Sequence, residues 1–428
     1  MMIVLLLFTS TIAIFSFFIR KDIMNPIFIF NFIWSLIILL FELQLFRTIE
    51  ITNTTIGILY CMILSFDFGA LLYSCIKKSN RKIKSDIVRK FQLRKSVFMV
   101  LAIVTIVTLL LDEIEIIKNL LSGLTFKQIM ALANGKGTVE IVGSFRVLLY
   151  VFIVHPMSYV VSPVCAVQFI KYKNKKYLLI NLIITFLNVA HHGGRISIFV
   201  LALSYLTVFL FYNKKEKREI KIKPKYKIII LCSIATFLYL LVLLSSSRGI
   251  NDVWLSFYAY LICCIPLSTI YISSYLFAYV GSTYGALTFN GFLYPFFGLL
   301  QYFGFKAPNS YKNAAIVKNI IEDNYVRIGD YHATAANNFI SAGAYPYIDG
   351  GYIFEIIVFI IIGFLIAYLY NKCCEKGSDR DLAIYCFCVI GVVFSFMSMM
   401  LSSYSYAIGL LIVAFILYEN KTKETNRS

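Results

Sequence analysis

Residues 177–212 read YLLINLIITFLNVAHHGGRISIFVLALSYLTVFLFY, an almost unbroken apolar run with one polar interruption, HHGGR, at 191–195. Basic segments flank the run on both sides, KYKNKK at 171–176 and KKEKRE at 214–219. The run is long enough to cross a hydrocarbon layer of ~30 Å twice. Because loops rich in Lys and Arg stay in the cytoplasm, these flanks predict a helical hairpin whose tip lies at the outer face. The two glycines of HHGGR suit the tight turn at such a tip.

The composition extends this pattern to the whole chain of 428 residues. Mean hydropathy is +0.79, 60% of residues are hydrophobic and 14% are charged, more apolar surface than a soluble core of this size could bury. We therefore predict an all-α polytopic membrane protein. The net charge of +18 does not indicate a nucleic-acid partner, because the basic residues lie in short loops between apolar runs. The ten Cys lack CxxC spacing and lie mostly in apolar runs, so neither a metal site nor a disulfide framework is expected.

Eleven apolar runs are candidate membrane spans: 2–19, 26–45, 55–76, 96–111, 147–169, 177–190, 196–212, 228–244, 351–370, 382–400 and 404–418. The first run lacks the basic start and the cleavage site of a signal peptide, so it counts as a span. Loops that follow every second run hold 29 of the 40 Lys and Arg residues. The amino terminus is therefore predicted outside and the carboxyl terminus in the cytoplasm.

Two segments are predicted to lie at the outer face of one transmembrane domain, 1–428. Residues 112–146 combine helical spacing of apolar residues with mixed charges, which predicts an amphipathic helix on the outer surface. Residues 245–350 form a large outer loop region. Its apolar parts, 255–280 and 284–303, are either a further pair of spans, giving thirteen, or interfacial and re-entrant helices. The sequence leaves both possibilities open.

The end of the large outer loop region reads NYVRIGDYHATAANNFISAGAYPYIDGG, residues 324–351. His332 and Asp330 are candidate general bases, since an imidazole or carboxylate beside Tyr331 can take a proton from a sugar hydroxyl. Both residues are equally well explained as solvated loop residues. Asp349 is also well explained as a cap for the helix that follows it.

Three arginines of the outer segments are candidate anion ligands. Arg195, Arg248 and Arg327 could converge on a diphosphate, because a guanidinium fork binds phosphate oxygens bidentately. The alternative for Arg195 is an interfacial side chain that reaches lipid phosphate. Asp67 and His155 lie in the middle of apolar runs, where an interhelical hydrogen bond explains them as well as a function does. They are therefore not counted among the candidate site residues.

Nucleotide-binding and common hydrolase motifs are absent from the sequence: there is no Walker motif, HExxH or GxSxG, and no GxGxxG in a strand context. An enzyme that works outside the membrane without nucleotides needs a substrate that is already activated. Lipid diphosphate sugars are such a class of substrate.

Two motifs resemble those of the bacterial oligosaccharide repeat-unit polymerases, the Wzy-type enzymes of O-antigen and capsule assembly. They are HHGGR at the hairpin tip and HATAANNFISAGAYPYIDGGYIFEIIVFIIIG at 332–363. The positions that match the family pattern are Gly194, Arg195, Thr334, Asn337, Asn338, Tyr347, Asp349 and Gly350. The Arg-x10-Gly pattern of some relatives has no copy here, because Leu206 and Ala259 stand where the glycine would follow Arg195 and Arg248. The resemblance in hydropathy covers the whole chain.

The resemblance implies a GT-C-like, metal-independent inverting glycosyltransferase of the bacterial cytoplasmic membrane, without a cofactor. The donor would be a growing glycan on undecaprenyl diphosphate, and the acceptor a new lipid-linked repeat unit. In this interpretation the diphosphate is bound by Arg195, Arg248 and Arg327, and His332 or Asp330 is the base. The sugars are held by His192, Tyr331, Asn337, Asn338 and Asp349.

The implied partners are the lipid bilayer, the two undecaprenyl-diphosphate-linked oligosaccharides, a chain-length regulator and a flippase, but no nucleic acid. Two other functions stay open. A flippase or transporter of lipid-linked oligosaccharide would account for Asp67 and His155, although no internal repeat of the transporter kind is evident. An O-antigen ligase also works through an outer loop, so the sequence separates it poorly from a polymerase.

Overall fold

The computed structural model describes residues 1–79, 90–123, 145–192, 196–215, 253–273, 280–323, 325–330, 335–336, 339–375 and 377–421. The helices of this part are α1 (Met2–Arg20), α2 (Pro26–Glu42), α3 (Asn53–Ser79), α4 (Lys95–Leu121), α6 (Phe145–Leu149), α7 (His155–Tyr172), α8 (Lys175–His192), α9 (Ile196–Lys215), α11 (Val253–Ile262), α12 (Cys264–Ser273), α13 (Asn290–Tyr302), α14 (Asn309–Asp323), α15 (Ala344–Glu375), α16 (Asp379–Val393) and α17 (Tyr404–Leu411). Two small antiparallel sheets pair β1 (Lys90–Leu93) with β4 (Tyr418–Lys421) and β2 (Val326–Arg327) with β3 (Ala335–Ala336).

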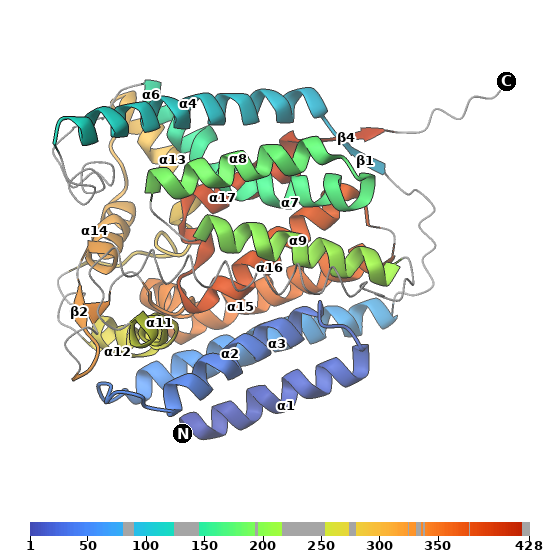
Figure 1. Ribbon diagram of the computed structural model, residues 1–428. Coiled ribbons are helices and arrows are strands. Elements are labelled where there is room, and N and C mark those ends of the chain that lie inside the picture. Colours follow the sequence, from blue (N-terminus) through green and yellow to red (C-terminus); the bar gives the residue numbers. More distant parts are fainter. Residues whose placement is uncertain are drawn as a thin grey trace.

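Ten of the eleven predicted spans overlap helices of the described residues, although 382–400 extends past the end of α16 at Val393, and the remaining one, 228–244, lies outside them (Figure 1). Six helical segments are long and apolar enough to cross a membrane: Met2–Arg20, Asn53–Lys77, Lys95–Asn119, Arg146–Tyr172, Ile196–Asn213 and Ala344–Glu375. The prediction of an all-α, multi-pass membrane protein is thereby confirmed.

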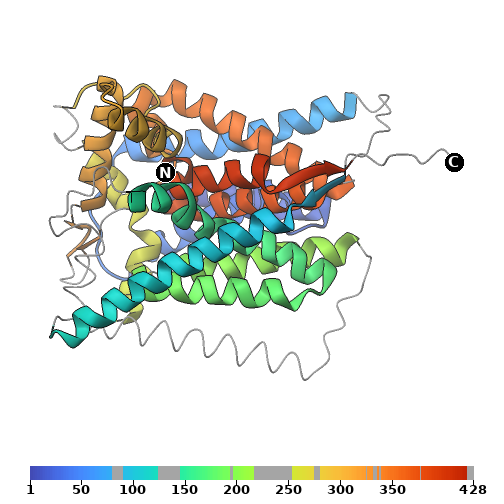
Figure 2. The ribbon, with the colours of Figure 1, turned by 90° about the horizontal axis from the view of Figure 1, so that it is seen from above.

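The long helices run along a common direction, and the two ends of the bundle differ (Figures 1 and 2). We call the end that carries α11, α12 and α14 the α14 end, and the end that carries β1 and β4 the β4 end. Three ion pairs join basic turns at the β4 end: Lys77 with Glu375 at 2.6 Å, Lys171 with Asp379 at 2.5 Å, and Arg94 with Glu419 at 3.6 Å. Four of the charged loops that alternate along the sequence therefore lie together in their described parts, those at 77–95, 170–177, 371–381 and 419–428.

The apolar parts of 245–350 form short helices. The helices α11 and α12 have 10 residues each and follow one another with only Cys263 between them, whereas α13, with 13 residues, falls well short of a ~30 Å layer at ~1.5 Å per residue. The choice between a further pair of spans and interfacial or re-entrant helices therefore stays a prediction, and residues 274–279 lie outside the described part of the chain.

The segment predicted as a separate amphipathic helix, 112–146, is organised differently. Its first ten residues continue α4 without interruption, since no Gly or Pro stands between Lys95 and Leu121 to end the helix. The helix is followed by Gly123, which has a φ of 92°. Residues 124–144 lie outside the described part of the chain.

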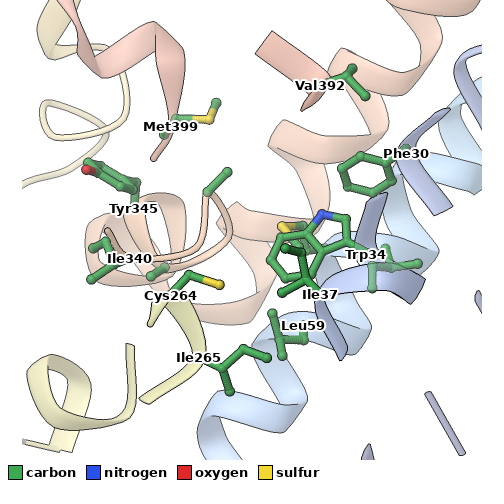
Figure 3. Packing of buried hydrophobic residues seen from close by; sticks show 14 of the residues in the cluster. Phe30, Trp34, Ile37, Leu59, Cys264, Ile265, Ile340, Tyr345, Val392 and Met399 are labelled. Carbon is green, nitrogen blue, oxygen red and sulfur yellow. The ribbon is translucent and has the colours of Figure 1, made fainter. Parts of the chain in front are cut away.

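The tightest packing joins α3 and α15. A Cβ added at Gly69 would lie 2.1 Å from the carbonyl oxygen of Ile360, and one added at Gly363 would lie 2.1 Å from that of Phe66. Small residues at such positions let two membrane helices approach with their backbones in contact. Figure 3 shows the neighbouring core, where the buried Trp34 donates a hydrogen bond from Nε1 to Ser395 Oγ at 3.1 Å.

Candidate functional site

The chain leaves regular helix between α16 and α17. Residues 394–403 contain only two short 3-10 turns, Phe394–Phe396 and Met400–Ser402. We call 394–403 the α16–α17 break. Gly291 of α13 packs directly on it, since an added Cβ would lie 2.5 Å from the carbonyl oxygens of Leu401 and Ser403. Irregular backbone at membrane depth is tolerated where it is covered by protein or lines a cavity, and both conditions are met here.

An apolar groove of about 200 Å³ leads to the α16–α17 break. It is lined by α15, α16 and α17 together with Phe30 and Phe66, and at the break by Ser395, Ser398, Met399, Met400 and Leu401. Its edge reaches the outside of the bundle at Leu365, which is 51% exposed. In a membrane such a side chain faces lipid, so the groove can admit a hydrocarbon chain from the bilayer.

A row of aromatic and imidazole rings begins at the first residue of α17. Tyr404 stacks on Tyr294 of α13 with 5.2 Å between ring centroids, and its hydroxyl shares a hydrogen bond with His155 Nδ1. Tyr150 meets the imidazole of His155 edge to face at 5.1 Å. The π-helical turn Tyr150–Val154 directly precedes His155. Because π-helical turns occur frequently at functional sites, the turn before His155 independently favours a functional role for this histidine.

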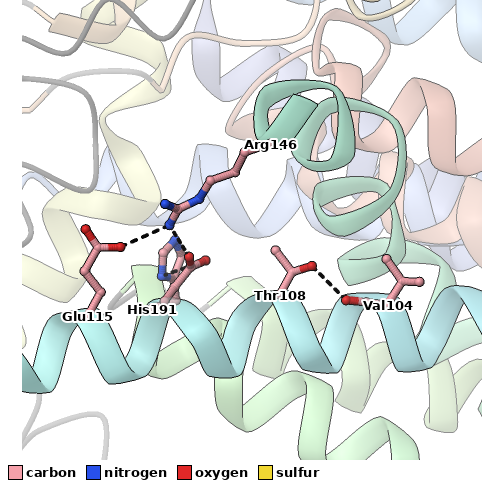
Figure 4. A network of polar contacts seen from close by, with 6 residues as sticks. Val104, Thr108, Glu115, Arg146 and His191 are labelled. Atoms are coloured by element: carbon pink, nitrogen blue, oxygen red, sulfur yellow. Dashed lines mark hydrogen bonds and ion pairs between the residues drawn. The ribbon is translucent and has the colours of Figure 1, made fainter. Parts of the chain in front are cut away.

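The row continues from Tyr150 to an ionic network between α4 and the start of α6 (Figure 4). Arg146 donates hydrogen bonds to the carboxylates of Asp112 and Glu115, the latter at 3.3 Å. His191 Nδ1 lies 4.0 Å from Asp112 Oδ2, and its ring stacks on Tyr150 at 6.3 Å. His191 stands at the end of α8, directly before the predicted hairpin turn.

We call these groups the polar cluster: Asp112, Glu115, Arg146, Tyr150, His155, His191, Tyr294 and Tyr404. It joins α4, α6, α7, α8, α13 and α17. It therefore connects the first residue of HHGGR with α13, which belongs to the large outer loop region.

Most of the sequence-predicted site residues lie outside the described part of the chain. These are Arg195, Arg248, Tyr331, His332, Asn337 and Asn338, and the side chain of His192 is also outside it.

Arg327 and Asp330 are described, and both are exposed. Arg327 donates from Nε to the carbonyl oxygen of Gly329 and from Nη2 to that of Asp330, both at 2.7 Å. The turn is anchored on the connection between α2 and α3, where the amide of Asp330 donates to Arg47 at 3.1 Å. Within the described part of the chain, Arg327 and Asp330 make hydrogen bonds to their own turn and to the α2–α3 connection. Neither residue contacts the polar cluster there.

Asp349 is buried, and its carboxylate accepts hydrogen bonds from two backbone amides, those of Leu287 at 3.1 Å and Thr288 at 2.7 Å. This contact fastens the segment that leads into α13 to the start of α15. The sequence suggests a local helix cap or a sugar ligand, whereas the observed partners belong to a segment about sixty residues earlier.

Sequence reasoning did not select Asp112, Arg146 or Tyr404. A signal for the first two was present, since Asp112 ends one apolar run and Arg146 opens the next, so that opposite charges meet at one membrane boundary. Tyr404 carries no such signal, because a tyrosine after two serines is common in loops.

The arrangement offers a proton-transfer pair, His155 with Tyr404, next to the α16–α17 break, and a compensated cation, Arg146, at the other end of the row of rings. No known protein family, curated protein or solved structure matches the chain.

Proposed function

We propose that the protein polymerises lipid-linked oligosaccharide repeat units at the outer face of a bacterial cytoplasmic membrane. It transfers the growing glycan from undecaprenyl diphosphate to a new lipid-linked unit, as a GT-C-like, metal-independent glycosyltransferase. The observation that carries the proposal is the apolar groove that ends at the α16–α17 break beside the polar cluster. A substrate with a hydrocarbon tail and a polar head needs these two environments side by side.

The charge distribution supports the orientation. Basic turns gather at the β4 end, which the positive-inside rule assigns to the cytoplasm. The α14 end, with the polar cluster and the short helices α11 to α13, then faces outward. Lipid-linked units would reach it from the outer leaflet.

In the proposed reaction an acceptor hydroxyl attacks the anomeric carbon of the donor glycan. A new carbon–oxygen bond forms as the bond to the lipid diphosphate breaks, and the hydroxyl proton passes to a base. Among the described residues His155 is the base candidate, because its Nδ1 shares a hydrogen bond with Tyr404, the first residue after the α16–α17 break. His332 and Asp330 stay candidates from the sequence.

Deleting the gene in its host tests the function. We expect single lipid-linked repeat units to accumulate and the ladder of longer glycans to disappear. A ladder that persists on the lipid carrier but is no longer transferred to its final acceptor would instead identify a ligase. Units that stay in the inner leaflet would identify a flippase.

A matched pair of variants tests the groove in the complemented strain. Leu365 lines the groove and Ile361, one turn earlier on α15, does not, although their exposed fractions are 51% and 52%. Leu365→Trp should lower the polymerisation rate about tenfold by narrowing the groove, whereas Ile361→Trp should leave it unchanged. Equal rates in the two variants would contradict a tail in the groove.

A further inference from the structure

The helix α17 starts at the α16–α17 break without a side-chain cap. Ser403 precedes its first residue, and the Ser403 hydroxyl makes no capping hydrogen bond. The first backbone N–H groups of a helix have no partner within the helix, and they carry the positive end of its dipole. An uncapped helix start in a protein interior therefore favours an anion.

A second polar group at the same place lacks a partner. Ser402 is 3% exposed, and its Oγ has no hydrogen-bond partner within the described part of the chain. A buried hydroxyl without a partner costs free energy, and in native proteins most such groups are paired. Ser402 ends the 3-10 turn that leads into α17 and stands two residues before the first residue of that helix, so both features belong to the α16–α17 break.

A cation reaches the same location from α14. Lys318 Nζ donates a hydrogen bond to the carbonyl oxygen of Ser402 at 3.2 Å, and lies 3.8 Å from Glu322 Oε1. An ammonium group has three donors, so Lys318 can bind a further acceptor while it keeps the contact with Ser402. Arg146 and Arg327 differ, because the first is bound by two carboxylates and the second by backbone carbonyls.

We propose that Lys318, the Ser402 hydroxyl and the start of α17 form a binding site for a diphosphate, the head group of the lipid carrier. Helix starts bind phosphate groups because their N–H groups and dipole both favour negative charge. The apolar groove explains why the diphosphate is attached to a lipid, since Met400 and Leu401, the two residues before Ser402, line the groove, as does Tyr406 of α17. This identification of the head group rests on the proposed function.

Binding to the purified full-length protein in detergent tests the site. The probes are undecaprenyl diphosphate, undecaprenol and inorganic pyrophosphate, and the readout is the dissociation constant. Wild type should bind undecaprenyl diphosphate more tightly than undecaprenol. Lys318→Met should weaken binding of the diphosphate about tenfold or more, because it removes a charged hydrogen bond, and should leave binding of undecaprenol unchanged.

Two further variants separate charge from folding. Lys318→Arg keeps the cation, so it should restore most of the affinity. Lys312→Met removes the same charge from an exposed position on the same helix and should bind like wild type. If Lys318→Met binds undecaprenyl diphosphate as tightly as wild type, the site is wrong. If inorganic pyrophosphate binds as tightly as the lipid, the anion site stands but its assignment to a lipid head group is wrong.

The site and the proposed function can fail separately. Binding that depends on Lys318, in a protein that does not extend purified lipid-linked units, would keep the site and reject the polymerase. Extension that Lys318→Met leaves unchanged would keep the polymerase and reject the site.

Discussion

Two interruptions of apolar helices at the α14 end are built in opposite ways. In α15, Gly350 and Gly351 depart from helical geometry, with φ/ψ of −166°/26° and 69°/−166°. Beside this interruption, Asp349 binds the amides of Leu287 and Thr288. At the α16–α17 break, by contrast, α17 starts uncapped and the hydroxyl of Ser402 has no partner in the described part of the chain.

The difference separates a structural interruption from one that is available to a ligand. In the first, a charged side chain takes up backbone donors of another segment, so the interruption holds two parts of the chain together. In the second, polar groups are left beside an apolar groove, where nothing in a lipid tail can satisfy them. Polar groups that stay unpaired at membrane depth are costly, and binding an anion would offset that cost.

The largest effect on stability is expected for Asp349→Ala. The change leaves two buried amides without an acceptor, which should lower the free energy of unfolding by about 2–4 kcal/mol. Unfolding of the purified protein in detergent micelles measures this. Asp330→Ala, which removes an exposed carboxylate, is the control and should shift the free energy by less than about 0.5 kcal/mol. If Asp349 serves mainly to hold a sugar, its alanine variant will instead unfold like wild type while polymerisation is lost.

A smaller loss is expected for Gly351→Ala. A φ of 69° with a ψ of −166° is a region that only Gly adopts without strain, and a Cβ at Gly351 would meet no atom within 4 Å. The whole effect is therefore conformational, about 1–3 kcal/mol. Gly298 of α13 also has open space around it but lies within regular helix, so Gly298→Ala should be neutral or slightly stabilising. Equal stabilities for the two variants would show that the α15 interruption is not strained.

The sequence predicted the helices well because length and hydropathy determine them. A run such as 2–19 or 55–76 has no stable state in water, so its boundaries follow from composition, and α1 and α3 agree with them closely. The segregation of charge was equally predictable, because the positive-inside rule acts on each loop separately.

The site was harder to predict because it depends on contacts between distant residues. Lys318 meets Ser402 across 84 positions of the chain, and His155 meets Tyr404 across 249. No local pattern encodes such pairs. His155 illustrates the limit: its depth in an apolar run was visible in the sequence, but the aromatic partners on both sides of its ring were not. Of the three arginines predicted to bind the diphosphate, Arg327 is described, and its guanidinium already donates hydrogen bonds to two backbone carbonyl oxygens.

The smallest effect on stability is expected within the α16–α17 break itself, where two buried serines form a matched pair. Ser395 Oγ accepts the hydrogen bond from Trp34, so Ser395→Ala leaves an indole N–H unpaired and should cost about 1–2 kcal/mol. Ser402→Ala removes a hydroxyl that has no partner in the described residues, so the free energy of unfolding should change by less than about 0.5 kcal/mol. Its binding of undecaprenyl diphosphate should nevertheless weaken roughly threefold to tenfold, because the hydroxyl contributes one hydrogen bond to the ligand. If Ser402→Ala is instead as destabilising as Ser395→Ala and binds normally, the second interruption is structural like the first, and the contrast between them disappears.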